Sequence, residues 1–204
     1  MFTRLSNSWE LIKASAAVLR ADKELLIFPF VSAILSVLVL ITFAVPTVLA
    51  GVIDETTTRG NFPISGYIIG FLFYVAQYFV IIFANSALIG AALIRLRGGD
   101  PTVGDGFRIA FSHIAAIFGY AVISATVGMV LRAIAQRGGI LGRIVASLFG
   151  MAWNLATYLV IPVMVVENSG PIDSIQRSAN YLKKTWGEQI AGNKLTMNVV
   201  AGQS

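Results

Sequence analysis

Four long apolar runs dominate the hydrophobic pattern of this chain, and charged residues separate them. A helix of about 20 apolar residues is long enough to cross a bilayer core of about 30 Å. The pattern therefore predicts four membrane-spanning helices. Their expected bounds are residues 25–52, 64–94, 114–131 and 144–166.

Three further segments carry apolar residues at helical spacing on one face only, which is typical of amphipathic helices lying in a membrane surface. These are residues 3–23, 102–111 and 171–187, and residues 188–204 form a tail. In the second segment Thr102 and Asp105 have the spacing of a capping box, although Gly104 and Gly106 lower its helix propensity. The expected order is a surface helix followed by two spans, repeated once, and then a third surface helix.

Composition supports a membrane protein and excludes several other classes. Hydrophobic residues make up 56% of the 204 residues, charged residues 12%, and the mean hydropathy is +0.78. A soluble domain has a more even balance. We therefore expect an all-α, polytopic transmembrane bundle that forms a single membrane domain over residues 1–204. The absence of cysteine excludes disulfides and thiolate metal sites.

The distribution of basic residues predicts the orientation in the membrane. Eleven Lys and Arg lie on the side of the two termini and of the loop between the second and third spans, against four on the other side. Because basic loops stay in the cytoplasm, both termini should be cytoplasmic, in the plasma (inner) membrane. The net charge of +5 then suits anionic lipid headgroups, since no basic patch suitable for nucleic acid is present.

Three stretches carry a resemblance to a known family. They run from Arg95 to Val103, from Ser124 to Gly128 and from Val166 to Glu188. The chain resembles an uncharacterised family of bacterial and archaeal multi-pass membrane proteins of unknown function. The resemblance extends to about Gly192 and implies about six spans. The last two would then be missing, and we expect truncation rather than a naturally shortened member.

Polar residues inside the four predicted spans are few. The span interiors contain no Asp, Glu, Lys or Arg, which disfavours a proton-coupled pump. The amides that remain are Gln77, Asn85 and Asn154. They either form hydrogen bonds between neighbouring helices or converge to line a polar cavity.

The sequence contains few residues in patterns that support catalysis or metal binding. His113, Asp100 and Glu167 could meet at the cytoplasmic edge, but they lack the spacing of metal ligands. A nucleophile elbow, a phosphate loop and a dinucleotide fingerprint are all missing from the sequence. We therefore expect no enzyme activity, no metal and no cofactor.

The third surface segment is the best candidate for lipid contact. Arg177, Lys183 and Lys184 could reach lipid phosphates, and Trp9 and Trp186 are suited to anchor their segments at the interface. Membrane lipids are therefore the expected partners.

Small residues and prolines recur within the spans. Pairs four residues apart include Gly66 with Gly70, Ser124 with Gly128, and the series Gly142, Ala146 and Gly150. Such spacing favours close packing of helices, either inside one bundle or between this chain and another copy or another membrane protein. Pro46 and Pro162 each predict a kink or a break in a span.

Three hypotheses of function follow. The first is a non-catalytic membrane scaffold or accessory subunit with lipid contacts at its cytoplasmic face. The alternative is a permease, or a component of one, for a neutral or lipid-like substrate, which requires Gln77, Asn85 and Asn154 to converge. The third is a membrane enzyme, which requires His113, Asp100 and Glu167 to lie within a few ångströms of one another.

Overall fold

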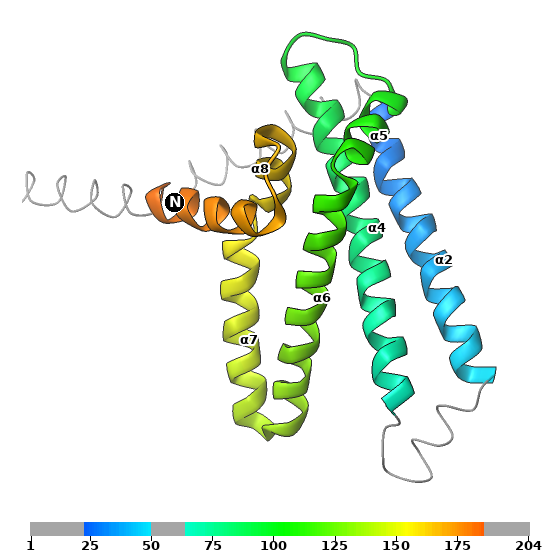
Figure 1. Cartoon of the computed structure of the whole chain (residues 1–204), viewed down its shortest axis with the longest axis vertical. Coiled ribbons are helices and arrows are strands. Elements are labelled where there is room, and N and C mark those ends of the chain that lie inside the picture. The colour runs from blue at the N-terminus through cyan, green and yellow to red at the C-terminus, as the bar shows by residue number, and fades with distance from the viewer. Residues whose placement is uncertain (1–22, 50–63, 186–204) are drawn as a thin grey trace, which may run out of the picture.

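The computed structural model describes residues 23–49 and 64–185, and this part of the chain is helical throughout apart from short turns. Four helical segments are long and apolar enough to span a membrane, which confirms the all-α fold class (Figure 1). These are α2 (Ile27–Leu49), α4 (Ile64–Leu96), α6 (Ile114–Arg137), and α7 (Gly139–Ala156) continued by α8 (Val160–Glu167). A 3-10 turn, η1 (Lys23–Leu26), precedes α2.

The spans pack side by side largely in chain order. α4 is central and packs against α2, α6 and α8, whereas α7 packs against α6, so α2 and α7 lie at the two edges (Figure 1). The buried core gathers toward the end where α5 (Val103–Ser112) crosses α4. Its members are Leu25, Phe28, Ile82, Ala87, Ala91, Ala110, Ile117, Tyr120, Ala121, Val160 and Met164.

α5 begins with the predicted capping box. The Thr102 hydroxyl accepts a hydrogen bond from the backbone N–H of Asp105, and the Asp105 carboxylate accepts from the Thr102 N–H at 3.1 Å. The hydrogen bonds from Thr102 lower the pKa of Asp105. α5 was expected to lie in the membrane surface, and the structure packs it against α4. Phe107 contacts the Phe28 ring with centroids 5.3 Å apart.

A glycine makes this packing possible. A Cβ on Gly106 would lie 2.4 Å from Cζ of Phe28 and 2.7 Å from the Ala87 carbonyl oxygen. The sequence suggested that Gly106 only weakens α5. In the structure it is the point at which α5 approaches the backbone of α4, and such contacts require a residue without a side chain.

α6 and α7 form a hairpin with almost no loop. α6 continues to Arg137 and α7 starts at Gly139, where a positive φ of 58° suits glycine. The third and fourth spans are therefore longer than the predicted 114–131 and 144–166. Those bounds stopped at Arg132 and Arg143, whereas arginines near a span end are accommodated because their long side chains reach toward water.

The fourth span is broken between α7 and α8. The turn lies at residues 157–159, where Thr157 Oγ1 donates to the Trp153 carbonyl at 2.7 Å. Pro162 lies in the first turn of α8, where no intrahelical partner for its missing N–H is needed. α2, in contrast, is continuous through Pro46. Pro162 thus lies at the start of a new helix, whereas Pro46 does not interrupt α2.

A further helix, residues 171–185, runs across the break (Figure 1). The backbone N–H of Leu159 donates to Oγ of the buried Ser178 at 3.0 Å, so this helix supplies an acceptor that the broken span lacks. Ser174, also buried, donates to the Gly170 carbonyl at 2.7 Å. The helix predicted as a surface element is therefore joined to the core by one face.

Candidate functional site: the groove between α4 and α6

A groove of about 380 Å³ lies between α4 and α6. It lies toward the start of α4 and the end of α6, which is the end of the molecule opposite α5. Its lining residues are Gly66, Tyr67, Gly70, Phe73, Tyr74, Met129, Arg132, Ala133 and Gln136.

Glycines and aromatic rings give the groove its shape. A Cβ on Gly70 would meet no heavy atom within 4 Å, so this stretch of α4 is open. Phe73 stands beside it and packs edge-on against Phe43 of α2, with ring centroids 5.7 Å apart. The small-residue spacing of Gly66 and Gly70 thus forms the floor of a groove, whereas Gly142 and Ala146 are buried in α7.

Arg132 is the charged residue of the groove. Its guanidinium donates to the hydroxyl of Tyr74 at 2.5 Å and so links the two helices across the groove. Five residues separate Arg132 from the end of α6, which places its backbone about 8 Å inside the span at 1.5 Å per residue. An arginine this close to a span end is exposed and reaches with its long side chain toward the headgroup layer, where lipid phosphates lie.

No carboxylate lines the groove to neutralise this charge. Among the described residues, ion pairs join Arg95 to Asp100, Arg108 to Asp105, and Arg177 to Glu167, all toward the α5 end. In the described residues Arg132 instead donates to the neutral phenol of Tyr74. Within the described residues, the groove therefore combines an apolar floor with a positive charge that has no carboxylate partner.

Comparison with known proteins places the chain in a family. The model of the family of unknown function DUF6159 matches residues 64–203. The chain belongs to DUF6159. This confirms the resemblance to an uncharacterised family, and the match includes all residues that line the groove. Among curated proteins and solved structures, none matches this DUF6159 chain.

The three amides predicted as a polar cavity lie apart in this DUF6159 chain. Asn85 lines a second cavity of about 260 Å³ between α2 and α4. Gln77 is half-buried, and its Oε1 is buried without a hydrogen-bond donor. Asn154 is exposed on α7. None of the described cavities is lined by all three residues.

The residues considered for an enzyme have separate partners in the DUF6159 structure. The Asp100 carboxylate pairs with Arg95 at 2.8 Å, and Nδ1 of His113 lies 2.8 Å from the Ile109 carbonyl oxygen. Glu167 accepts from Arg177 and from the Tyr181 hydroxyl. Within the described residues, no three His, Asp or Glu side chains are grouped to hold a metal ion.

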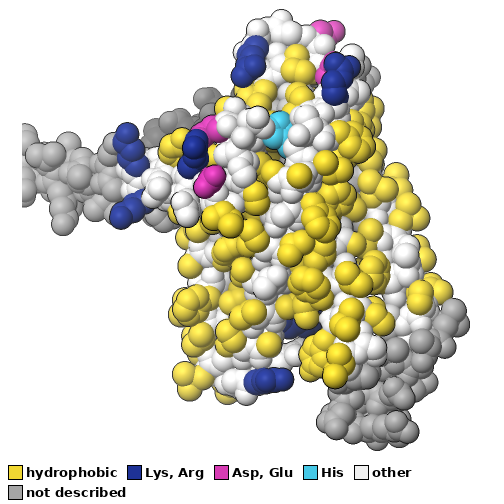
Figure 2. Space-filling view, viewed as in Figure 1, with side chains coloured by type: hydrophobic (Ala, Val, Ile, Leu, Met, Phe, Trp, Pro, Cys, Tyr) yellow, Lys and Arg dark blue, Asp and Glu magenta, His cyan; other side chains and the backbone are white. Residues whose placement is uncertain are grey.

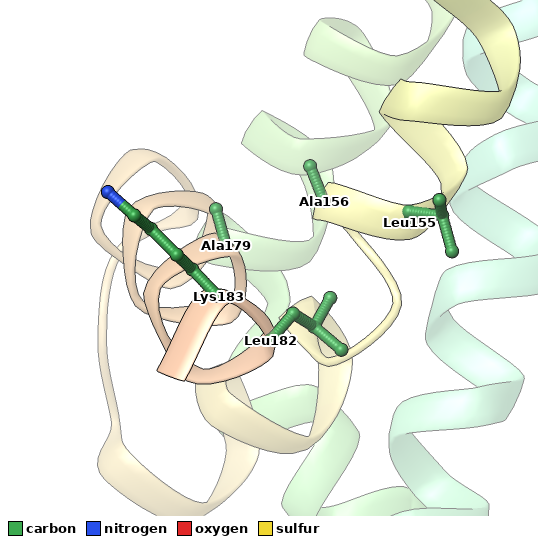
Figure 3. A pocket seen from close by; sticks show the side chains of 5 residues that line it. All are labelled: Leu155, Ala156, Ala179, Leu182 and Lys183. Atoms are coloured by element: carbon green, nitrogen blue, oxygen red, sulfur yellow. The ribbon is translucent and has the colours of Figure 1, made fainter. Parts of the chain in front are cut away.

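The predicted lipid-contact residues lie on helix 171–185 of the DUF6159 chain. Arg177 is paired with Glu167, which raises the pKa of Arg177, whereas Lys183 and Lys184 are exposed. Lys183 lines a small cavity beside Leu155, and its amino group points away from that residue (Figure 3). Trp9 and Trp186 lie outside the described residues.

Sequence reasoning missed the groove because it ended the third span one residue before Arg132. The available signal was helical spacing: Met129, Arg132 and Gln136 recur at intervals of three and four residues, so they share one face of a helix that continues past 131.

Proposed function

We propose that this membrane protein is a non-catalytic scaffold or accessory subunit that associates with another membrane protein through the outer face of α7. The observation that carries the proposal is Asn154. This amide is exposed on the apolar α7 helix, and the described residues provide it with no hydrogen-bond partner.

Asn154 lies in the last turn of α7, which is a largely apolar helix. It lies 15 residues along α7 from Gly139, or about 22 Å from the α6–α7 turn at 1.5 Å per residue. Lipid chains offer no hydrogen bond to an amide that faces them, whereas amides in spans stabilise helix association by about 0.6 to 2 kcal/mol. Ser147 lies two turns earlier on the same flank of α7 and is also exposed. By helical spacing both lie about a quarter-turn round α7 from the buried Ala146, so they form a polar stripe along one flank.

Other features of the fold support the same role. α2 and α7 stand at the edges of the bundle with large exposed apolar residues, among them Ile34, Leu38, Leu148 and Phe149. In the face shown in Figure 2, hydrophobic side chains cover the middle, and charged ones lie at the upper end, on the projecting helix and at the lower end. Such a belt is expected for a multi-pass protein with lipid or protein neighbours on all sides.

Cysteine cross-linking tests the association face. The chain has no cysteine, so each variant carries a single reactive thiol. Ser147→Cys, labelled in native membranes with a thiol-reactive photo-cross-linker, is expected to form a protein adduct, and Asn154→Ala in that background should abolish the adduct. Leu148→Cys is the matched control, because it lies at a similar depth about 100° further round α7, opposite the buried Ala146, and is 62% exposed.

Lys183 and Lys184 are proposed to contact anionic headgroups on the cytoplasmic side. Seven of the ten Lys and Arg in the described part lie toward the α5 end, namely Lys23, Arg95, Arg97, Arg108, Arg177, Lys183 and Lys184. This distribution supports the orientation with both termini in the cytoplasm of the plasma (inner) membrane.

Reversing the two lysine charges tests the lipid contact. A peptide of residues 171–188 carrying Lys183→Glu and Lys184→Glu should lose at least about 2 kcal/mol of binding to anionic vesicles, since each basic residue contributes about 1 kcal/mol. Binding is measured by co-sedimentation. Neutral vesicles serve as the control, and equal binding of both peptides to anionic vesicles would refute the contact.

The break in the fourth span favours the second candidate, a permease for a neutral or lipid-like substrate, since broken helices often form transporter sites. Two observations weigh against it. Ser178 already satisfies the Leu159 N–H at the break, and Gln77, Asn85 and Asn154 share no described cavity. The scaffold is therefore the function that the geometry supports better.

A further inference from the structure

We infer that the groove between α4 and α6 binds an anionic phospholipid, with the lipid phosphate on Arg132 and one acyl chain along the floor formed by Gly66 and Gly70. This inference does not rest on the proposed scaffold function, because the groove and the outer face of α7 are different surfaces.

Charge selects the headgroup. Arg132 offers guanidinium donors in a planar fork that matches two oxygens of a phosphate. The hydrogen bond to Tyr74 uses one of these donors and leaves others available. The Tyr74 hydroxyl accepts from Arg132 and keeps its own proton, which it can donate to the same phosphate.

The lining discriminates against zwitterionic lipids. Gln136 adds a neutral amide at the edge of the groove, and no lining residue is acidic. A choline or ethanolamine headgroup would bring its cation beside Arg132 without a carboxylate to receive it. A phospholipid with a net negative charge, such as phosphatidylglycerol, avoids this repulsion.

The shape of the groove is suited to an acyl chain. The space beside Gly70 is open, and the rings of Tyr67 and Phe73 and the side chain of Met129 flank it. The volume of about 380 Å³ is suitable for part of one acyl chain and its glycerol but not for a whole lipid. The rest of the lipid would remain in the surrounding bilayer, as a lipid held at a helix interface does. A free phosphate ion would leave this apolar floor uncovered.

The test is native mass spectrometry of the full chain, delipidated in a neutral detergent and titrated with phosphatidylglycerol or with phosphatidylcholine of the same acyl chains. The unmodified chain is expected to retain phosphatidylglycerol selectively. Arg132→Gln should weaken this binding by about tenfold, as expected for the loss of one charge-assisted hydrogen bond. Arg143→Gln, which removes the same charge at the same end outside the groove, should leave it unchanged.

A second variant covers the case in which Arg132→Gln fails to fold. Gly70→Leu fills the floor of the groove without a close contact at Cβ and keeps the charge, so it should also weaken phosphatidylglycerol binding. Three results would overturn the proposal: equal losses in the Arg132 and Arg143 variants, equal retention of the two lipids, or displacement of phosphatidylglycerol by inorganic phosphate. Unchanged binding in Gly70→Leu would overturn the proposed path of the tail.

Discussion

Replacing Gly106 with alanine is expected to destabilise the protein by about 3 kcal/mol, because overpacking a core commonly costs about 1 to 3 kcal/mol and this site offers no room to relax. The new Cβ would lie 2.4 Å from a ring atom of Phe28, which is fully buried, and 2.7 Å from a backbone oxygen of α4. α5 would have to move away from α4. Thermal unfolding in detergent, followed by helical circular dichroism, measures the loss.

Gly104 is the matched control for Gly106. It lies in the same helix, but a Cβ there would meet only the Thr102 hydroxyl oxygen, at 3.7 Å. Gly104→Ala should therefore raise stability by about 0.5 to 1 kcal/mol, the ordinary gain of alanine over glycine inside a helix. Equal stability of the Gly106 and Gly104 variants would contradict the packing of α5 described above.

Replacing Gly142 with alanine is expected to cost a similar amount, about 3 kcal/mol, by opening the α6–α7 hairpin. The new Cβ would lie 2.4 Å from the Ile134 carbonyl oxygen. That oxygen is backbone and already accepts from the Gly138 N–H at 3.0 Å, so it cannot turn aside. The same unfolding measurement applies.

Gly150 provides the comparison within α7. A Cβ at this position would meet only a Leu131 side-chain atom at 3.7 Å, an ordinary contact distance. Gly150→Ala should thus be neutral or slightly stabilising. If Gly142→Ala behaves in the same way, the hairpin is not as tight as the structure has it.

The four spans and the start of α5 could be predicted from sequence because their causes are local. Apolar runs identify spans by length alone, and the capping box needs only Thr102 and the residue three positions later. Residues 1–22 and 186–204 lie outside the described part, so the predicted first surface helix, residues 3–23, stays a prediction.

The features that sequence reasoning missed depend on contacts between distant residues. Gly106 lowers helix propensity locally, and only the approach of Phe28 and α4 reveals that a side chain cannot fit. The break in the fourth span is stabilised by Ser178, 19 residues beyond Leu159. The hydropathy pattern ends the third span just before Arg132, whereas α6 continues past it and places its side chain in the groove. Sequence spacing could not show these pairings.

The polar amides illustrate the same limit in another way. Gln77, Asn85 and Asn154 were grouped because each interrupts an apolar run, but residue type does not determine which helix face each residue occupies. The structure directs Asn85 to the cavity between α2 and α4 and Asn154 to the outside of α7. Asn154, which was expected to line a cavity, is instead the residue on which the proposed association rests.

The central claim, that the Asn154 flank of α7 contacts another protein in the membrane, is tested most directly by cross-linking from Ser147→Cys in native membranes. We expect a protein adduct from this position, none from Leu148→Cys, and loss of the adduct when Asn154 is changed to alanine. Lipid labelling alone from both positions, or an adduct that persists in the Asn154 variant, would contradict the scaffold account.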